Sequence, residues 1–251
     1  IIQTWIKAYG AIADAFIGLE KDIYKQMAWE GFKPFEVTNI TEETELIKSF
    51  TVTSNRIDLS QFIPGQYITV DISSEKLPYR AKRHYSIVDG DESYLTFGVR
   101  RDVTETHEGE VSTVLHDEVT EGDILNISAP VGGFKLENIE NKQLFLGSGV
   151  GVTPLVSMFN EAVNIGTPAI FLQSTSNAQN VAFEEKLTTI ANQSDHAQFD
   201  IHFRDEDGFI ESEQLRQYVD NETEIYVCGG NSFLKAMIAE LQTLGISMNH
   251  V

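Results

Sequence analysis

The sequence is poor in cysteine, with Cys228 as its only thiol among 251 residues. A single thiol excludes an internal disulfide framework, and no CxxC pair or histidine-cysteine cluster suggests structural zinc. We therefore expect no metal site. A reducing, cytoplasmic setting fits this composition best.

Basic residues are also scarce: 18 Lys and Arg stand against 38 Asp and Glu, a formal net charge of −20. Such a field repels nucleic-acid phosphates and anionic lipid headgroups, so no nucleic-acid partner is expected. It also disfavours anionic cofactors. Any dinucleotide site must therefore be built from local positive groups and backbone amides.

A long uninterrupted apolar run is absent as well. The apolar N-terminal stretch is broken by Gln3, Lys7, Asp14 and Glu20, which excludes a signal peptide and stable membrane insertion. Its apolar residues recur every three or four positions and predict an amphipathic helix over residues 2–27. No capping residue precedes it, so we interpret residues 1–31 as the last helix and linker of an otherwise missing domain. Its apolar stripe is a candidate surface for self-association.

The length predicts two further domains, each with its own core. Between residues 35 and 128 the apolar pattern has period two, and turn signals separate its segments, which predicts an antiparallel β-barrel over residues 32–138. A helix is expected there only at Val111–Asp117. The clearer strands are Leu46–Thr53, Gln66–Ile72, Tyr94–Val99 and Asp123–Ser128.

Strand and helix patterns alternate after Asn138, which predicts an α/β domain with a parallel sheet over residues 139–251, again C-terminally truncated. The fold class is therefore multidomain α+β: one helix, a barrel and a parallel-sheet domain. The alternating segments are Gln143–Gly147, Pro154–Asn164, Pro168–Ser174, Phe183–Asn192, Phe199–Arg204, Glu211–Val219, Ile225–Cys228 and Ser232–Leu244.

A glycine-rich turn, GSGVGVTP over residues 147–154, joins the first of these strands to the first helix. Glycines let a backbone approach a pyrophosphate, Thr153 can cap the helix, and Pro154 suits its first position. Free amides and the helix dipole then favour a phosphate. The spacing is not GxGxxG, because Val152 occupies the last glycine position. A tight turn without a ligand is the alternative.

Three further motifs lie in the barrel region: PGQY at 64–67, RHYS at 83–86 and GEVS at 109–112. Arg83 offers a fork of donors suited to a diphosphate, and the faces of Tyr67 and Tyr85 suit a flat ring. Ser86 adds a small hydroxyl, and amides at Val111 and Ser112 suit another phosphate. For any single tyrosine at alternating strand positions, half-buried packing is the more common role, and the order of the motifs is what favours a ligand site.

In this order, PGQY, RHYS, GEVS, GVGVTP and YVCGG (226–230) resemble the ferredoxin-NADP-reductase superfamily. The segment TWIKAYG at residues 4–10, followed by Phe16-Ile17 and residues 20–24, resembles the terminal globin helix of flavohaemoglobins. Together these similarities cover nearly the whole chain. They narrow the resemblance to the flavohaemoglobin family, whose members are nitric oxide dioxygenases.

The resemblance implies an FAD site in the barrel. Arg83 would neutralise the FAD pyrophosphate, Tyr85 would pack on the flavin ring, and Ser86 would bond near the nitrogen that receives hydride; Tyr85 and Ser86 are thus the expected catalytic residues. Tyr67 would border the flavin, with His84 inside the same motif. The FAD phosphate segment would be Gly109, Glu110, Val111 and Ser112.

It also implies an NAD(P)H site in the sheet domain and haem b only in the full-length parent. Cys228 and Gly229 would lie where the nicotinamide approaches. Glu20 matches a catalytic glutamate that orients the haem ligand in the family's globin domain. The pyrophosphate turn would consist of Gly149, Val150, Gly151, Val152, Thr153 and Pro154.

The function expected from this resemblance is hydride transfer from NAD(P)H to FAD, then electron transfer to a globin haem that oxidises nitric oxide to nitrate. The partner would be the globin domain of the same polypeptide. A free-standing reductase with a separate protein acceptor and a non-catalytic dinucleotide-binding module are the alternatives. The turn Ser174–Asn177 contains no arginine that could bind a 2′-phosphate, and this absence favours NADH as the coenzyme. Arg204 is the alternative residue that could reach such a phosphate and would favour NADPH.

Overall fold

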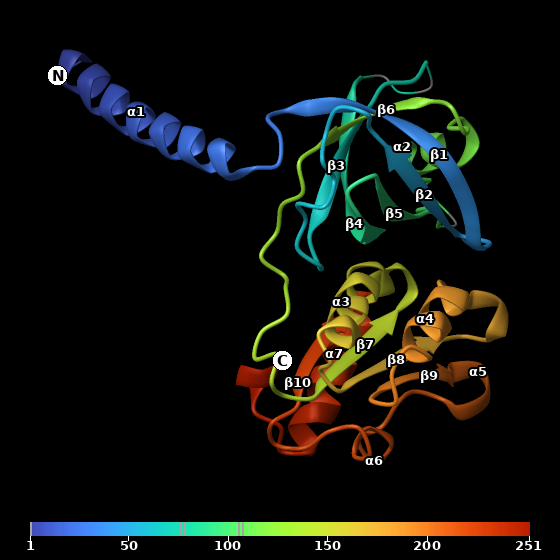
Figure 1. Cartoon of the computed structure of the whole chain (residues 1–251). Coiled ribbons are helices and arrows are strands. Elements are labelled where there is room, and N and C mark those ends of the chain that lie inside the picture. The colour runs from blue at the N-terminus through green and yellow to red at the C-terminus, as the bar shows by residue number, and fades with distance from the viewer. Residues whose placement is uncertain (1, 76, 78, 105, 107) are drawn as a thin grey trace.

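The computed structural model describes residues 2–75, 77, 79–104, 106 and 108–251, without the side chains of residues 2 and 20–26. Helix α1 (Ile2–Gln26) projects away from a barrel, and a sheet with covering helices lies below the barrel in the view of Figure 1. The predicted helix is confirmed. Its apolar stripe is exposed at Trp5, Ile6, Tyr9, Ile12, Phe16 and Ile17.

The barrel is closed by six antiparallel strands in the order β1-β2-β5-β4-β3-β6, as the period-two pattern predicted. Two strands, β1 and β4, were not among those singled out from the sequence. Helix α2 (Glu110–Asp117) lies between β5 and β6 in the chain. The strands are β1 (Phe32–Thr44), β2 (Ile47–Thr53), β3 (Tyr67–Ile72), β4 (Ala81–Gly90), β5 (Tyr94–Arg100) and β6 (Ile124–Ser128).

The segment after α1 is part of the barrel rather than a free linker. The Trp29 side chain is buried in the barrel core, and its Nε1 donates to the Ile127 carbonyl at 3.1 Å. Strand β1 begins at Phe32, because its ladder with β6 starts there with Phe32 opposite Ser128. The sequence pattern Trp29–Pro34, typical of a linker that ends the helix, is therefore strand from Phe32 onward.

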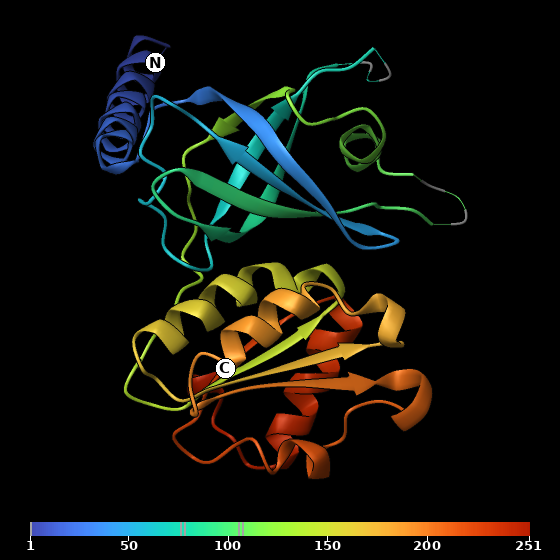
Figure 2. The same ribbon diagram turned by 45° about the vertical axis from the view of Figure 1, so that its right-hand side comes forward.

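The second half is a four-stranded parallel sheet in the order β10-β7-β8-β9, as the alternating pattern predicted. Helices α3 (Val152–Asn164) and α4 (Glu184–Ala191) cover the face toward the barrel, and α7 (Asn231–Thr243) covers the other face (Figure 2). The strands are β7 (Gln143–Ser148), β8 (Ala169–Thr175), β9 (Ala197–Phe203) and β10 (Glu224–Cys228). Shorter turns are η1 (Gly149–Gly151), η2 (Ala178–Asn180), α5 (Arg204–Asp207), α6 (Ser212–Leu215) and η3 (Met248–His250).

The helix predicted at Glu211–Val219 is wrong in length, because the structure contains only α6. A capping box between Glu211 and Gln214 starts this helix. The chain then turns: the Tyr218 amide donates to the Leu215 carbonyl, and the Tyr218 hydroxyl donates to Asp200 of β9 at 2.7 Å. That tertiary bond takes the chain away from the helical path.

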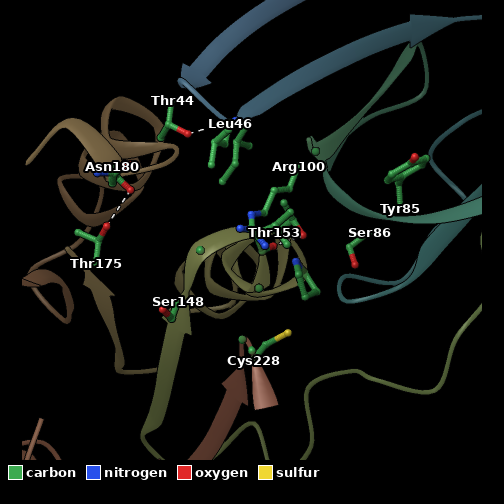
Figure 3. A pocket seen from close by; sticks show the side chains of 18 of the residues that line it. Thr44, Leu46, Tyr85, Ser86, Arg100, Ser148, Thr153, Thr175, Asn180 and Cys228 are labelled. Carbon is green, nitrogen blue, oxygen red and sulfur yellow. Dashed lines mark hydrogen bonds between the residues drawn. The ribbon is translucent and has the colours of Figure 1, made fainter. Parts of the chain in front are cut away.

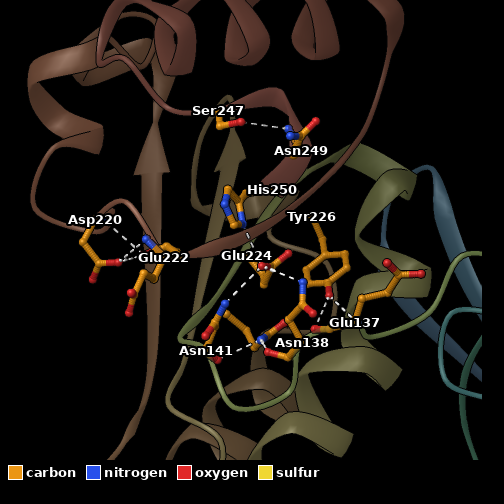
Figure 4. Close-up of polar contacts among 12 residues, drawn as sticks. Glu137, Asn138, Asn141, Asp220, Glu222, Glu224, Tyr226, Ser247, Asn249 and His250 are labelled. Atoms are coloured by element: carbon orange, nitrogen blue, oxygen red, sulfur yellow. Dashed lines mark hydrogen bonds and ion pairs between the residues drawn. The ribbon is translucent and has the colours of Figure 1, made fainter.

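A buried carboxylate anchors the connection between barrel and sheet. Glu224 Oε1 accepts from Asn138 Nδ2 at 2.9 Å and Asn141 Nδ2 at 3.2 Å, and lies 2.8 Å from His250 Nδ1 (Figure 4). Burial raises the pKa of Glu224, but these contacts lower it more, so its net shift is downward. The connecting segment, β10 and η3 thus share one anchor.

The two halves pack tightly against each other. Ile47 and Val88 belong to the barrel strands but lie in the apolar core beside α3 and α4. The Gly65 amide donates to Ser157 Oγ of α3 at 3.1 Å. A Cβ on Gly98 of β5 would lie 2.5 Å from the Thr153 methyl. Such close approach fixes the barrel relative to the sheet.

Candidate active site

A cavity of about 650 Å³ lies between the barrel and the carboxyl ends of the parallel strands (Figure 3). Crevices at this edge of parallel sheets are the usual ligand sites of such folds. The barrel contributes Thr44, Leu46, Ile47, His84, Tyr85, Ser86, Gly98 and Arg100. The sheet half contributes Ser148, Gly149, Val150, Gly151, Thr153, Pro154, Thr175, Ser176, Asn180, Arg204, Cys228, Gly229 and Gly230.

Three residues of the RHYS segment, His84, Tyr85 and Ser86, form part of the barrel wall and lie on β4. The Tyr85 ring stacks on Phe97 with centroids 5.7 Å apart, and burial raises the pKa of its phenol well above the ordinary value. The Tyr85 hydroxyl therefore stays protonated at neutral pH. His84 Nδ1 lies 2.9 Å from Thr69 Oγ1 on the paired strand β3. Ser86 is half-buried at the cavity edge.

The glycine turn forms the opposite wall with its backbone. A Cβ on Gly151 would lie 2.5 Å from the Cys228 carbonyl and the Gly229 amide nitrogen, so the turn touches the end of β10. Gly149 has a φ of 57°, the left-handed region that favours glycine. Crowding thus accounts for glycine at position 151, and the backbone conformation accounts for glycine at position 149.

Two details expected at this turn are wrong. Helix α3 begins at Val152, which puts Pro154 at its third position rather than its first. Thr153 does not cap the helix: its Oγ1 donates to the Val150 carbonyl at 2.8 Å. The physical reason is the short turn η1, which already winds the backbone before α3 and makes Gly151 the capping position.

Cys228 ends strand β10 and lines the cavity beside the glycine turn. Its side chain is half-buried rather than fully buried, so it is not simply a small core residue. Burial raises the pKa of the thiol, which keeps it neutral at physiological pH. Gly229 follows at the same edge of the sheet.

The charge of the cavity lining differs from that of the whole chain. Arg100 and Arg204 line it, whereas no Asp or Glu does. Among the described residues, neither arginine forms an ion pair. Arg100 extends toward the start of α3 beside Thr153 (Figure 3). The cavity is therefore the local positive exception that an anionic dinucleotide needs.

Several expected site residues lie outside this cavity lining. Tyr67 starts β3, with its ring 4.8 Å from that of His84. Arg83 is exposed and donates to the Lys82 carbonyl at 2.9 Å. Val152 is buried in the core beside α3. The side chain of Glu20 lies outside the described residues.

The segment Gly109, Glu110, Val111 and Ser112 also lies apart from the lining, at the start of α2. Val111 is buried in the barrel core, and Glu110 is exposed. Ser112 Oγ donates to the Gly109 carbonyl and accepts from the Asp102 amide. The Ser112 hydroxyl is thus engaged within the protein, which leaves backbone amides as the donors of this segment.

Sequence reasoning missed Arg100 and the residues Thr44, Leu46 and Ile47. Arg100 pairs with Ile47 at the ends of β5 and β2, so both reach the cavity by strand register. The signal in the sequence was the period-two pattern of residues 94–99, which continues by one residue to Arg100. Over the described part of the chain, no cluster of three His, Cys, Asp or Glu side chains is suited to a metal, and no helix could cross a bilayer.

Comparison with known proteins agrees with this geometry. Residues 145–239 match the family model described as oxidoreductase NAD-binding domain. The whole chain is 33% identical to the flavohemoprotein of Bacillus thuringiensis subsp. konkukian and covers 68% of it.

Two solved structures share the fold. One is the flavohem-like FAD/NAD binding domain of nitric oxide dioxygenase from Vibrio cholerae, with a TM-score of 0.79, 23% identity, and coverage of 87% of this chain and 95% of that domain. The other is flavohemoglobin from Malassezia yamatoensis with bound FAD and heme, with a TM-score of 0.82, 19% identity, and coverage of 100% of this chain and 67% of that protein.

The barrel, the parallel sheet and the cavity between them define the class: an FAD-containing NAD(P)H oxidoreductase module. Within this class, the chain belongs to the flavohemoprotein family.

Proposed function

We propose that this chain transfers hydride from NAD(P)H to an FAD held by the barrel, and that the electrons then pass to a globin haem that converts nitric oxide to nitrate. The observation that carries the hydride step is the shared cavity, which is lined by Tyr85 and Ser86 from the barrel and by the glycine turn and Cys228 from the sheet half. Family membership supports the haem step. We place the reaction in the cytoplasm, and the boundary between barrel and sheet domains at residues 138 and 139.

The barrel residues fit a flavin. Tyr85 belongs to the cavity lining, with its ring stacked on Phe97, and an aromatic residue at this place suits a flat ring. Arg83 has no carboxylate partner among the described residues, so its guanidinium is available for a pyrophosphate. The amides at the start of α2 suit the remaining phosphate charge. Tyr67 and His84 border this region.

The sheet residues fit a dinucleotide. Gly149 and Gly151 allow the turn to approach the pyrophosphate, with the start of α3 behind it. Arg100 reaches this turn from the barrel, so both halves of the chain contribute to one phosphate site. Cys228 and Gly229 would lie beside the nicotinamide. Glu20 would help to orient the haem ligand of the joined globin domain, as the family resemblance implies.

Bound FAD would supply the hydride acceptor. Hydride transfer needs no acid or base from the protein once the two rings are stacked, so positioning supplies much of the rate. Ser86 would hold the flavin edge by a hydrogen bond, and Tyr85 would exclude water from one side. The neutral Cys228 thiol adds no charge near the reacting atoms.

The test is anaerobic reduction of the purified chain after loading with FAD. We expect the visible absorbance of oxidised flavin to bleach on addition of NADPH or NADH. FAD that binds but does not bleach would contradict hydride transfer. Failure to bind FAD would favour the alternative of a non-catalytic dinucleotide-binding module.

The haem step requires a second measurement with the globin domain joined to this chain. Nitric oxide consumption that depends on NAD(P)H and yields nitrate supports the full proposal. Rapid flavin bleaching without electron transfer to the joined haem would instead favour a reductase with a separate protein acceptor.

A further inference from the structure

The end of the cavity formed by β8 and β9 carries an arginine that the proposed pyrophosphate site does not use. Arg204 directly follows β9, and the pairing of Thr175 with Phe203 places Ser176 beside it in register. The Asp205 amide donates to the Ser176 carbonyl at 3.0 Å, which fixes the two segments together. Arg204 and Ser176 both line the cavity.

A small hydrogen-bond network orients the turn after β8. Asn180 Nδ2 donates to Ser176 Oγ at 3.0 Å and to Asn177 Oδ1 at 2.8 Å. Thr175 Oγ1 donates to the Asn180 carbonyl at 2.9 Å. Because Ser176 Oγ accepts from Asn180 and has no acceptor of its own among the described residues, its proton is available to a ligand. The turn therefore presents a hydroxyl donor next to a guanidinium.

The charges around this position favour an anionic group. Arg204 is half-buried and unpaired among the described residues, although three acidic residues follow it in α5. None of these carboxylates lines the cavity, and that of Asp205 accepts from Asn177 Nδ2 at 3.2 Å. Sheets that bind NAD place a carboxylate near the second strand to hold the ribose hydroxyls, and an arginine there accommodates a 2′-phosphate. Here the cavity offers an arginine and no carboxylate.

We infer that the chain selects NADPH over NADH, and that Arg204 and Ser176 hold the 2′-phosphate. This inference rests on the proposed function, because it assigns one end of the same dinucleotide site. It reverses the lean toward NADH drawn from residues 174–177, since the arginine comes from the next strand. Two arginines in one cavity then serve two phosphate positions: Arg100 the pyrophosphate and Arg204 the 2′-phosphate.

The test compares binding of ADP-ribose and ADP-ribose 2′-phosphate to the full chain by calorimetry, which requires no flavin turnover. The wild-type chain should bind the 2′-phosphorylated probe about 10- to 100-fold more tightly, as expected for a charge-assisted contact. In Arg204→Gln the two affinities should become equal within about 2-fold. The matched control is Arg216→Gln, because Arg216 is an exposed arginine at the end of α6. This variant should keep the wild-type ratio of the two affinities.

Equal binding of both probes to the wild-type chain, or an unchanged ratio in Arg204→Gln, would overturn the inference and leave the proposed function intact. Failure of both probes to bind would overturn the dinucleotide site itself. If Arg204→Gln misfolds, Ser176→Ala is the second variant. We expect it to lower the preference for the 2′-phosphorylated probe several-fold. With FAD loaded, the kcat/KM ratio of NADPH to NADH should fall in parallel.

Discussion

The two walls of the cavity are built from different parts of the polypeptide. The barrel wall presents side chains, chiefly His84, Tyr85, Ser86 and Arg100, on strands whose register fixes their direction. The sheet wall combines side chains with a backbone turn that is rich in glycine, on η1 and after β10. Side chains can be shortened step by step, whereas the backbone at Gly151, already against the end of β10, admits no added atom. The two walls should therefore respond differently to substitution.

The largest effect is expected at the backbone wall, for Gly151→Ala. The new Cβ would lie 2.5 Å from the Cys228 carbonyl and the Gly229 amide, neither of which is a flexible side-chain end. The turn must move, which misplaces the dinucleotide, and misplacement near 1 Å costs on the order of 100-fold in rate. We expect loss of that order in flavin reduction by NADPH, measured by anaerobic stopped flow.

Gly133→Ala is the control for this substitution, because a Cβ there meets nothing within 4 Å. It should reduce flavin at the wild-type rate. Near-normal reduction in Gly151→Ala would show that the turn does not hold the dinucleotide, and would remove the distinction between the two walls.

A smaller, graded effect is expected at the side-chain wall, for Tyr85. Tyr85→Ala removes one of the two rings stacked on Phe97, leaving Phe50, and takes away the aromatic surface proposed to contact the flavin. A loss of about 1–3 kcal/mol corresponds to about 5- to 150-fold weaker FAD binding. Tyr85→Phe keeps the ring and should bind FAD within a few-fold of wild type. Titration of FAD fluorescence gives both affinities, and equal losses in the two variants would contradict ring packing as the cause.

A contact between the barrel and the sheet half predicts how the stability of the chain depends on pH. Glu43 of β1 accepts from Ser49 Oγ at 2.7 Å and from the Phe183 amide, before α4, at 3.2 Å. Burial raises the pKa of this carboxyl, outweighing those hydrogen bonds. A raised pKa means that the folded chain holds the proton more tightly. The stability from this group is therefore complete below its ordinary pKa of 4.5 and is lost as pH rises through the raised value.

Glu43→Gln tests this because glutamine keeps an oxygen acceptor but does not titrate. The melting temperature of Glu43→Gln relative to wild type should increase as pH rises from below 4.5 toward neutrality. Comparing two chains removes the contribution of the other carboxylates. A difference that is constant with pH, or that decreases, would contradict the raised pKa.

The smallest effect is expected for the ion pair between Lys186 of α4 and Asp89 of β4. Both side chains are partly exposed, so the pair should contribute about 0.2–1 kcal/mol. Lys186→Met should lower the melting temperature slightly, and the loss should shrink in high salt. A large loss that is insensitive to salt would mean that this edge, rather than the packing at Gly98 and Gly65, holds the halves together.

The sequence predicted the sheet wall more fully than the barrel wall. The glycine turn is contiguous, so residues 149–154 could be found by inspection. Arg100 could not, because it reaches the cavity through the pairing of β5 with β2, and Arg204 could be named from the sequence but not placed until β9 was paired with β8. The short α6 was missed for the same reason: the bond from Tyr218 to Asp200 is tertiary. Local pattern thus predicted the elements, while strand register decided which side chains share the cavity.

The most direct test of a single cavity with a fixed arrangement of the two rings is flavin bleaching with NADPH that carries deuterium on one or the other face of its reactive carbon. If the glycine turn holds the pyrophosphate so that the nicotinamide, beside Cys228, stacks on the flavin near Tyr85 and Ser86, only one of the two isomers should slow the bleaching. Equal slowing by both isomers would contradict a fixed arrangement, and no slowing by either would show that hydride transfer does not limit bleaching here.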